Sequence, residues 1–511
     1  MAAGSDSVAA RVLTTVSWAA AAYLLALLCG YYLHLGDVRR HHVESASFIL
    51  IALLLAGVIS RRSGQTPAQG DSARPFAMRV LTPTFLALAA TLYFFVLGSG
   101  LFADDYVLLE AARQGRLTVW SELFRPIPFV VWRTLSSAGS DVAPVLHVVN
   151  VALHAINGLL VCALAYQVGA PRWTGVAAGV LFISFPASVE AVAWPSGIQD
   201  VLMTTFVLGF LTLVIRPTQS PASAMGAVVL LVAALLTKET AVVAPALAAT
   251  LCAAARPSRA TWLRIAAATG VVVVFLAIRF SLVPLPVGHG APMSRYAAKE
   301  LLVRPFATLI VPFRESELSE LPALGLVVST LIVVTLCAAV SRWHRSHHDF
   351  HLALATSGLA LLSIAPVYSY FHVNPDLHGS RYLYLSAAGW SMFLVTVLRE
   401  NSPRARWAAA GLVVFVFGLW SIFSVLHQHT WLEAGALRDR ILSAAGRAPL
   451  DRCEAWSVSG LPDLFAGVPL FINGFPEAMR AAGRPERFRI GPRPADGECR
   501  LWWTGNELAH E

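Results

Sequence analysis

The chain has 511 residues, of which 56% are hydrophobic and only 13% are charged, and its mean hydropathy is +0.63. This apolar share lies well above that of soluble domains, so the composition indicates an integral membrane protein with many spans. The formal net charge of +8 does not indicate a nucleic-acid partner, because the basic residues flank apolar runs and do not gather on one face.

The expected fold is an all-α polytopic membrane protein. A bilayer core needs roughly 20 apolar residues per helix, and this length predicts about thirteen transmembrane helices. The first is too long for the apolar region of a signal peptide and is interpreted as a span. The predicted spans are residues 13–35, 45–60, 80–100, 142–166, 174–191, 199–215, 224–237, 241–255, 264–284, 322–340, 351–368, 382–398 and 407–426.

Basic residues in the connecting loops predict the orientation of the spans. With the N-terminus in the cytoplasm, the inner loops collect most arginines and the outer loops most acids. Asp104 and Asp105, residues 285–321, residues 369–381 and the C-terminus then face outward. Abundant arginine and alanine with only two lysines indicate a bacterial source, so the cytoplasmic (inner) membrane is the expected location.

The chain divides into three parts on this pattern. Residues 1–79 hold N-terminal spans and a cytoplasmic loop, residues 80–427 a transmembrane core with outer loops, and residues 428–511 a small extracytoplasmic domain. Within the core, residues 120–139 and 295–313 interleave aromatic, aliphatic and arginine side chains. That mixture predicts amphipathic helices lying on the outer face of the membrane.

The polar tail contains short strand-like runs around one helical segment, which predicts a small α/β domain. Its two cysteines, Cys453 and Cys499, could form a disulfide if the tail lies outside the cytoplasm. The sequence leaves that pairing open.

One predicted span carries polar residues along a single face. His147, Asn150, His154 and Asn157 follow one another at helical spacing, so they should point into the bundle. For His154 and Asn157 we favour hydrogen bonding between helices. His147 and Asn150 lie nearer the outer end, and for them a role in a site is an equal alternative.

Acidic residues and a rare lysine lie at the predicted outer ends of other spans. Glu190 sits in an apolar stretch, where a buried acid needs a partner. Asp200 opens a helix, a position that the helix dipole favours for an acid. Lys238 and Glu239 occupy a short outer hairpin, either as an exposed ion pair or as a site in which Lys238 meets a phosphate at headgroup height.

The last outer loop brings His378, Arg381, Tyr382 and Tyr384 together. Arginine can donate a fork of hydrogen bonds to a phosphate. The tyrosines also fit an aromatic belt at the membrane surface. The spacing of the histidines predicts no metal site.

Six segments occur in a distinctive order: "FADDYVLL", "RPIPFVVWRTL", "LHVVNVALH", "FPASVEAVAWPSGIQDVL", "LLTKETAVVAP" and "SRYLYLSAAG". This ordered set resembles the C-type (GT-C) membrane glycosyltransferases, in particular the branch of protein O-mannosyltransferases and transmembrane-TPR mannosyltransferases. The resemblance runs from Asp104 to about Trp431. The TPR array is absent, and the chain has Phe185 and Ile198 where the family often has histidine and arginine.

The resemblance implies a glycosyltransferase that moves a sugar from a polyprenyl phosphate, which would be undecaprenyl phosphate in a bacterium, to an acceptor hydroxyl on the outer side. The acceptor would be a protein, a lipid or a glycan. By analogy with the family's first loop acid, Asp104 would be the general base, and Asp105 would orient the acceptor or bind a sugar hydroxyl. The competing interpretation of this pair is a solvated helix cap.

Cations would stabilise the departing lipid phosphate. The residues expected to bind the phosphate are Arg381, Lys238, Arg125 and Tyr382, and further candidates for the site are Glu190, Glu239, His147, Asn150 and His378. One base and one leaving group imply inversion without a covalent intermediate. No cofactor is required, although related oligosaccharyltransferases use a divalent metal, which stays an alternative.

Other functions fit part of the pattern. A different enzyme on the same scaffold could modify lipid A, cell-wall glycan or arabinan. A transporter or flippase of lipid-linked sugars would place its polar groups near the middle of the bilayer and often shows inverted repeats. Here the polar groups cluster at the outer boundary and no repeat is visible. A catalytically inactive scaffold subunit is the remaining alternative.

Overall fold

The computed structural model describes most of the predicted core and the tail. It covers residues 75–116, 124–137, 141–216, 220–255, 257–282, 305–320, 347–367, 373–398, 403–448, 453, 455–484, 487–491, 498–505 and 507–510. The predicted spans 13–35, 45–60 and 322–340, and most of the predicted surface helix 295–313, lie outside these residues.

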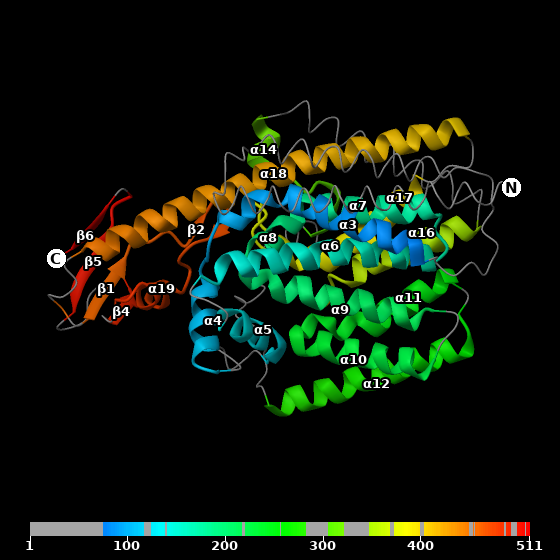
Figure 1. The fold of residues 1–511 in the computed structure, drawn as a ribbon, viewed down its shortest axis with the longest axis horizontal. Helices are drawn as coiled ribbons and strands as arrows, with labels where there is room; N and C mark the ends of the chain where they lie inside the picture. The colour runs from blue at the N-terminus through cyan, green and yellow to red at the C-terminus, as the bar shows by residue number, and fades with distance from the viewer. Residues whose placement is uncertain are drawn as a thin grey trace.

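Apolar helices pack side by side in one bundle, as Figure 1 shows. Helix α6 contacts α3, α7 and α9, and α9 continues the layer to α10, while α16 packs on α11 and α17. The helices of the bundle are α3 (Pro75–Leu92), α6 (Ala143–Gln167), α7 (Arg172–Ser184), α9 (Ile198–Val214), α10 (Pro221–Thr237), α11 (Ala244–Ala255), α12 (Arg259–Leu282), α16 (His347–Leu362), α17 (Tyr384–Val397) and α18 (Pro403–Arg447).

The length and composition of these helices confirm a helical membrane protein. Among the described residues, four helices are long and apolar enough to cross a membrane, and the number is up to five if a bent pair counts as one span. Shorter apolar helices of 10–17 residues accompany them. The total of thirteen spans stays a prediction.

Prolines break one predicted span near its C-terminal end. The segment 174–191 folds as α7, a short turn η2 (Pro186–Ser188) and α8 (Val189–Ala193), and the two parts are bent by 55°. A second turn, η3 (Pro195–Gly197), precedes α9. Proline lacks a backbone N–H and disfavours helical geometry in the residue before it, so the chain turns here and brings α8 into the interior of the protein.

Short helices cover the same end of the bundle. These are η1 (Phe94–Gly98), α4 (Asp104–Arg113), α5 (Pro126–Ser136), η4 (Glu239–Val243), α14 (Glu315–Glu320) and η6 (Ser380–Leu383). Helix α5 lies inside the predicted surface segment 120–139 and packs on α4 and α10.

Helix α18 runs for 45 residues and leaves the bundle toward the C-terminal domain (Figure 1). A span was expected over residues 407–426, followed by a polar tail from 428. The helix continues through that boundary because Trp431, Ala434, Arg438 and Ile441 recur at helical spacing and are buried.

The C-terminal domain is a small α/β unit, as the sequence predicts. Its main sheet has the order β4-β1-β5-β6, in which β1 is parallel to β4 and β5, and β6 is antiparallel to β5. The remaining two strands form a hairpin. The elements are β1 (Ala455–Ser459), β2 (Leu464–Phe465), β3 (Val468–Pro469), α19 (Phe475–Ala481), β4 (Arg487–Ile490), β5 (Cys499–Trp503) and β6 (Leu508–His510).

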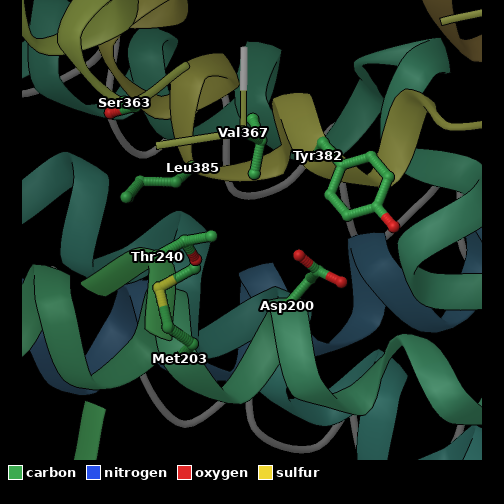
Figure 2. A pocket seen from close by; sticks show the side chains of 7 residues that line it. All are labelled: Asp200, Met203, Thr240, Ser363, Val367, Tyr382 and Leu385. Carbon is green, nitrogen blue, oxygen red and sulfur yellow. The ribbon is translucent and has the colours of Figure 1, made fainter. Parts of the chain in front are cut away.

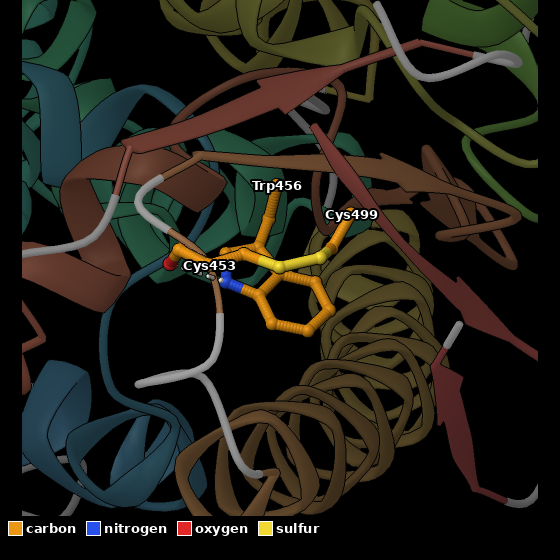
Figure 3. The surroundings of a disulfide bond; sticks show 3 residues. All are labelled: Cys453, Trp456 and Cys499. Atoms are coloured by element: carbon orange, nitrogen blue, oxygen red, sulfur yellow. Dashed lines mark hydrogen bonds between the residues drawn. A yellow bond between two sulfur atoms is a disulfide. The ribbon is translucent and has the colours of Figure 1, made fainter. Parts of the chain in front are cut away.

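A disulfide bond joins two parts of this domain that are far apart in sequence. Cys453, just before β1, pairs with Cys499, the first residue of β5, and their Cα atoms lie 6.1 Å apart (Figure 3). The Trp456 indole N–H donates to the Cys453 carbonyl over 3.2 Å. The cross-link therefore fixes the start of β1 against its neighbouring strand.

Candidate active site

The residues that the sequence marks as site candidates lie at the end of the bundle that carries α4, α5 and the C-terminal domain (Figure 1). They form two groups. One is the acid loop, residues 99–106, which contains both adjacent aspartates. The other is a layer of cations paired with carboxylates, which we call the cation layer and which consists of Arg125, Lys238, Arg381, Glu190, Asp200 and Glu239.

Asp105 is fully buried, and both of its carboxylate oxygens accept hydrogen bonds. The backbone N–H of Phe102 donates to Oδ2 over 2.7 Å, and that of Ser196 donates to Oδ1 over 2.8 Å. The Ser196 hydroxyl also donates to Oδ1. Burial raises the pKa of Asp105 to about 8 because loss of hydration outweighs these donors. This carboxyl ties the acid loop to η3.

Asp104 has different surroundings. It is partly exposed at the first turn of α4, and the Asn473 side-chain amide donates a hydrogen bond to its Oδ1. Within the described part of the chain, no other side chain hydrogen-bonds this carboxylate. Ala103, the residue before it, has a φ of 41°, which is uncommon for a residue other than glycine. The acid loop therefore holds Asp104 in a strained, fixed setting.

Arg438 of α18 fixes the beginning of the acid loop. Its guanidinium donates to the carbonyls of Ser99 and Leu101, each over 2.7 Å, and lies 4.9 Å from the Phe102 ring centre. The Arg438 side chain is 7% exposed and also pairs with Asp439. Its charge is thus satisfied, as a buried charge requires.

His147 and Asn150 of α6 bind backbone carbonyls. His147 Nε2 lies 3.0 Å from the Gly100 oxygen, and the Asn150 amide donates to the Trp194 carbonyl over 3.1 Å. Both side chains are fully buried. They therefore hold the acid loop and the segment before η3 in place from the same helix face.

His154 and Asn157, deeper on this face, contact Tyr384. His154 Nδ1 lies 2.6 Å from the Tyr384 hydroxyl, and the Asn157 amide donates to that hydroxyl over 3.2 Å. These are contacts between helices, which is the interpretation that the sequence favours for both residues.

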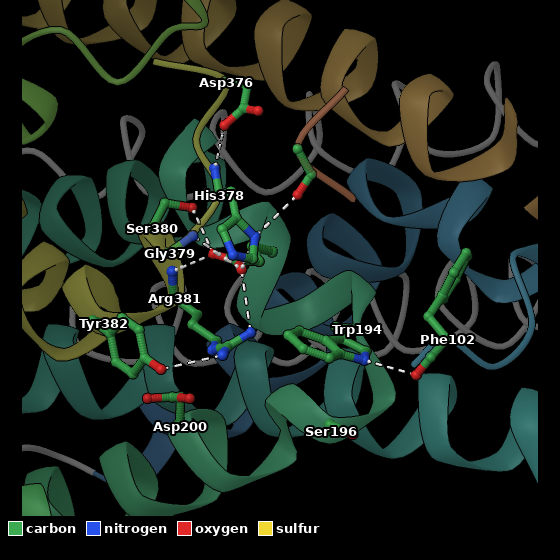
Figure 4. Close-up of polar contacts among 12 residues, drawn as sticks. Phe102, Trp194, Ser196, Asp200, Asp376, His378, Gly379, Ser380, Arg381 and Tyr382 are labelled. Carbon is green, nitrogen blue, oxygen red and sulfur yellow. Dashed lines mark hydrogen bonds and ion pairs between the residues drawn. The ribbon is translucent and has the colours of Figure 1, made fainter. Parts of the chain in front are cut away.

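Glu190 of α8 is the buried anion that organises the turn at η6 (Figure 4). Its carboxylate accepts the backbone N–H of Gly379 over 3.2 Å and that of Arg381 over 2.8 Å, and the Ser380 hydroxyl over 3.3 Å. His378 Nδ1 lies 3.7 Å away. The expectation that this acid needs a partner is met by the whole turn at η6.

The Arg381 side chain lies between two aromatic rings. Its guanidinium carbon is 4.3 Å from the Trp194 ring centre and 5.0 Å from that of Tyr382. The group donates to Glu190 over 3.3 Å and to the Tyr382 hydroxyl over 3.1 Å (Figure 4). Planar stacking and two fixed acceptors hold a buried guanidinium in one orientation.

Trp194 connects the cation layer to the acid loop. The ring that stacks on Arg381 also carries an indole N–H, which donates to the Phe102 carbonyl over 3.3 Å. The residue is 3% exposed. One rigid side chain thus touches both groups of the site.

Lys238 is buried and pairs with Asp200, not with its sequence neighbour. Its Nζ lies 2.5 Å from Asp200 Oδ1 and 4.6 Å from the Tyr382 ring centre. The lysine is 3% exposed and the aspartate 5%. An exposed Lys238–Glu239 pair, the alternative considered from sequence, is therefore not what the fold contains.

Glu239 instead pairs with Arg125, the residue that precedes α5. The guanidinium donates to both carboxylate oxygens, with Nε to Oε2 measuring 2.8 Å, and NH1 donates to Gln199 over 2.5 Å. Burial alone would lower the pKa of Arg125, but Glu239 raises it above its ordinary value, so the residue stays charged. Three cations and three carboxylates thus form three ion pairs in one largely buried layer.

A small cavity opens beside this layer (Figure 2). The Asp200 carboxylate and the Tyr382 ring form one side, and apolar side chains with two hydroxyl-bearing residues form the other. Thr240 Oγ1 is buried here and has no hydrogen-bond partner among the described residues. The lining residues are Asp200, Met203, Thr240, Ser363, Val367, Tyr382 and Leu385.

Sequence reasoning missed several residues of the site. The sequence predicts that Asp200 is a helix-dipole charge, whereas in the fold it is the partner of Lys238. Arg438 could have been found from the helical spacing of its neighbours in α18. Asn473 and Ser196 carry no signal in the sequence, because only the fold brings them to the aspartates.

No family model matches the chain. Among curated proteins, the chain is 32% identical over 186 residues to the "Protein O-mannosyl-transferase Tmtc2" of Drosophila melanogaster. The match covers 31% of this chain and 20% of that protein, so the chain spans about a fifth of the length of this relative. The similarity to the O-mannosyltransferase branch that the sequence motifs predict is confirmed by this match.

Two solved structures are similar to the chain at low identity. One is ArnT from Cupriavidus metallidurans bound to undecaprenyl phosphate, at 12% identity and a TM-score of 0.43, covering 85% of this chain and 94% of that one. The other is the arabinosyltransferase EmbB from Mycobacterium smegmatis, at 13% identity and a TM-score of 0.38, covering 87% of this chain and 44% of that one.

Proposed function

We propose that the protein is a membrane glycosyltransferase that moves a sugar from a polyprenyl phosphate to an acceptor hydroxyl on the extracytoplasmic side. The observation that carries this proposal is the position of the acid loop beside the cation layer, linked through Trp194. Transfer needs a base for the hydroxyl and positive charge for the departing phosphate, and the two groups supply one each.

Asp104 is the general base in this scheme. Its partial exposure and the carboxylate oxygen that Asn473 leaves unbonded support the assignment. Asp105 is buried with both oxygens engaged, which favours an anchoring role over the acceptor or sugar contact expected from sequence. A single base implies direct displacement with inversion at the anomeric carbon.

Arg381, Lys238 and Arg125 bind the lipid phosphate, with Tyr382 between the first two. Each of these cations already has a carboxylate partner, so the phosphate must share them with Glu190, Asp200 and Glu239. Sharing keeps every charge paired both before and after the lipid carrier leaves, which avoids an unpaired buried cation.

The remaining parts of the proposal follow the predicted topology and the similarity to an O-mannosyltransferase. The N-terminus is cytoplasmic, the C-terminal domain is extracytoplasmic, and the membrane is the bacterial inner membrane. A mannosyl donor on undecaprenyl phosphate and a protein acceptor are the first choices. In this topology the segment that forms helix α5 lies at the membrane surface on the same side.

Binding of undecaprenyl phosphate to Arg381→Lys protein tests the phosphate site. Lysine keeps the charge but loses the planar fork and the stacking, so we expect affinity to fall roughly tenfold, measured by native mass spectrometry in detergent. Arg133→Lys, which changes an exposed arginine of α5, is the matched control and should leave the affinity unchanged. Equal affinity of the Arg381→Lys and wild-type proteins would contradict the assignment.

A further inference from the structure

The C-terminal domain reaches the acid loop through the segment between β3 and α19. The backbone N–H of Ala103 donates to the Leu470 carbonyl over 3.1 Å. Three residues later, the Asn473 amide donates to the Asp104 carboxylate. The aspartate proposed as the base is therefore held by a domain that lies more than 360 residues away in sequence.

Backbone geometry on both sides of this contact requires a close approach. Gly474 has a φ of 80°, and a Cβ atom built there would collide with the Ala103 carbonyl oxygen. Ala103 itself has a positive φ. A strained residue that faces a glycine across two domains is typical of a segment whose position matters for function.

The orientation of the Asn473 amide points to the same conclusion. Its nitrogen faces Asp104, while its Oδ1 is buried without a hydrogen-bond partner among the described residues. A buried acceptor left unpaired is unfavourable. The side chain keeps this orientation because the opposite one would set its amide oxygen against the carboxylate.

We infer that Asn473 is a positioning residue, through which the C-terminal domain completes the active site by fixing the Asp104 carboxylate. With Oδ1 held by the amide, Oδ2 has one direction from which to accept the proton of the acceptor hydroxyl. Fixed geometry of this kind lowers the barrier of a reaction between bound groups. The inference rests on the proposed function, in which Asp104 is the base.

The test uses the full-length protein in detergent with two variants of Asn473. Asn473→Ala removes the donor, and Asn473→Asp keeps the shape but replaces the donor with a repelling oxygen. Arg480→Ala is the matched control, since Arg480 joins the same domain to Glu110 of α4 through an exposed ion pair without touching Asp104. Deuterium uptake of residues 101–106 measures how firmly the acid loop is held, without any substrate.

Release of undecaprenyl phosphate from undecaprenyl-phosphate mannose measures turnover of the same proteins. We expect both Asn473 variants to raise deuterium uptake of the acid loop and to lower kcat about tenfold or more at an unchanged donor KM. Arg480→Ala should stay within about twofold of wild type in kcat. A merely structural role would lower thermal stability in both variants without separating kcat from the donor KM.

Two results would overturn the inference in different ways. Unchanged uptake and kcat in the Asn473 variants, with an inactive Asp104→Asn protein, would refute the role of Asn473 and leave the proposed function standing. Full turnover by Asp104→Asn would refute the role of Asp104 as the base. The positioning role of Asn473 would then be refuted as well.

Discussion

At the residue scale, two adjacent carboxylates have opposite surroundings. Asp105 points into the protein and accepts three hydrogen bonds. Asp104 is partly exposed, and one of its carboxylate oxygens accepts a hydrogen bond from Asn473. The sequence places both acids at one helix start and assigns them separate roles only through the resemblance to the glycosyltransferases. That distinction depends on Ser196 and Asn473, which come from other parts of the chain.

The burial of Asp105 predicts a specific pH dependence of stability. The pKa of this group is 3.8 in its unperturbed state and about 8 in the folded protein, so the folded state binds the proton more tightly. Its contribution to stability is therefore complete below about pH 4 and is lost as the pH rises through about 8. Asp105→Asn should flatten this decline.

Thermal unfolding in detergent between about pH 5 and pH 9 measures the effect. Wild-type protein should lose stability toward the alkaline end more steeply than Asp105→Asn. Glu477→Gln, which changes a partly exposed acid of α19, should follow wild type. Parallel curves for wild type and Asp105→Asn would mean that the carboxyl does not bind its proton more tightly in the folded state.

At the element scale, hydropathy predicts the apolar helices well and their interruptions poorly. Spans such as 142–166 and 199–215 correspond closely to α6 and α9. The expected span 174–191 breaks at Pro186, which decides where Glu190 lies. Helix α18 exceeds its predicted span because its buried face beyond residue 427 includes polar residues, which a hydropathy window does not distinguish from a tail.

The sequence also does not predict which charged residues pair with one another. Lys238 and Glu239 are neighbours in sequence, but the chain leaves α10 in extended geometry at Lys238, and the two side chains reach Asp200 and Arg125, respectively. Only the packing of α9 and α5 beside that turn supplies these partners. The motifs thus predict which residues belong to the site but not how their charges pair.

Gly474 provides a test of the contact between the domains. Gly474→Ala should destabilise the protein by more than the roughly 1–2 kcal/mol that a left-handed conformation costs a residue with a side chain, because the new Cβ also meets Ala103. Gly483→Ala is the control, since Gly483 has a φ of 79° and open space around its Cβ position. Equal losses in thermal unfolding would show that the approach to Ala103 is not close.

At the scale of the whole molecule, the site sits where the helical bundle meets the C-terminal domain. Short helices and helix ends at one end of the bundle supply the cation layer. Helix α18 fixes the acid loop through Arg438, and the C-terminal domain contributes Asn473. The sequence predicts both units and places the candidate residues at one end of the bundle. It does not predict that the small domain touches the proposed base.

The disulfide provides a test of the proposed topology. On intact bacterial cells, a membrane-impermeant thiol reagent should label Cys453 and Cys499 only after an impermeant reductant is added, because the pair is oxidised and faces outward. Peptide mass spectrometry identifies the labelled positions. Labelling that requires opening of the cytoplasmic side would reverse the orientation, and labelling before reduction would argue against the bond.

Release of undecaprenyl phosphate from a sugar-linked donor tests whether Asp104 is the base of a glycosyltransferase. Wild-type protein and Asp104→Asn are compared, with Asp105→Asn alongside and each protein checked for binding of the donor. Loss of a general base should lower turnover by about 10²-fold or more in Asp104→Asn while donor binding persists. Turnover of Asp104→Asn at the wild-type rate would contradict the account.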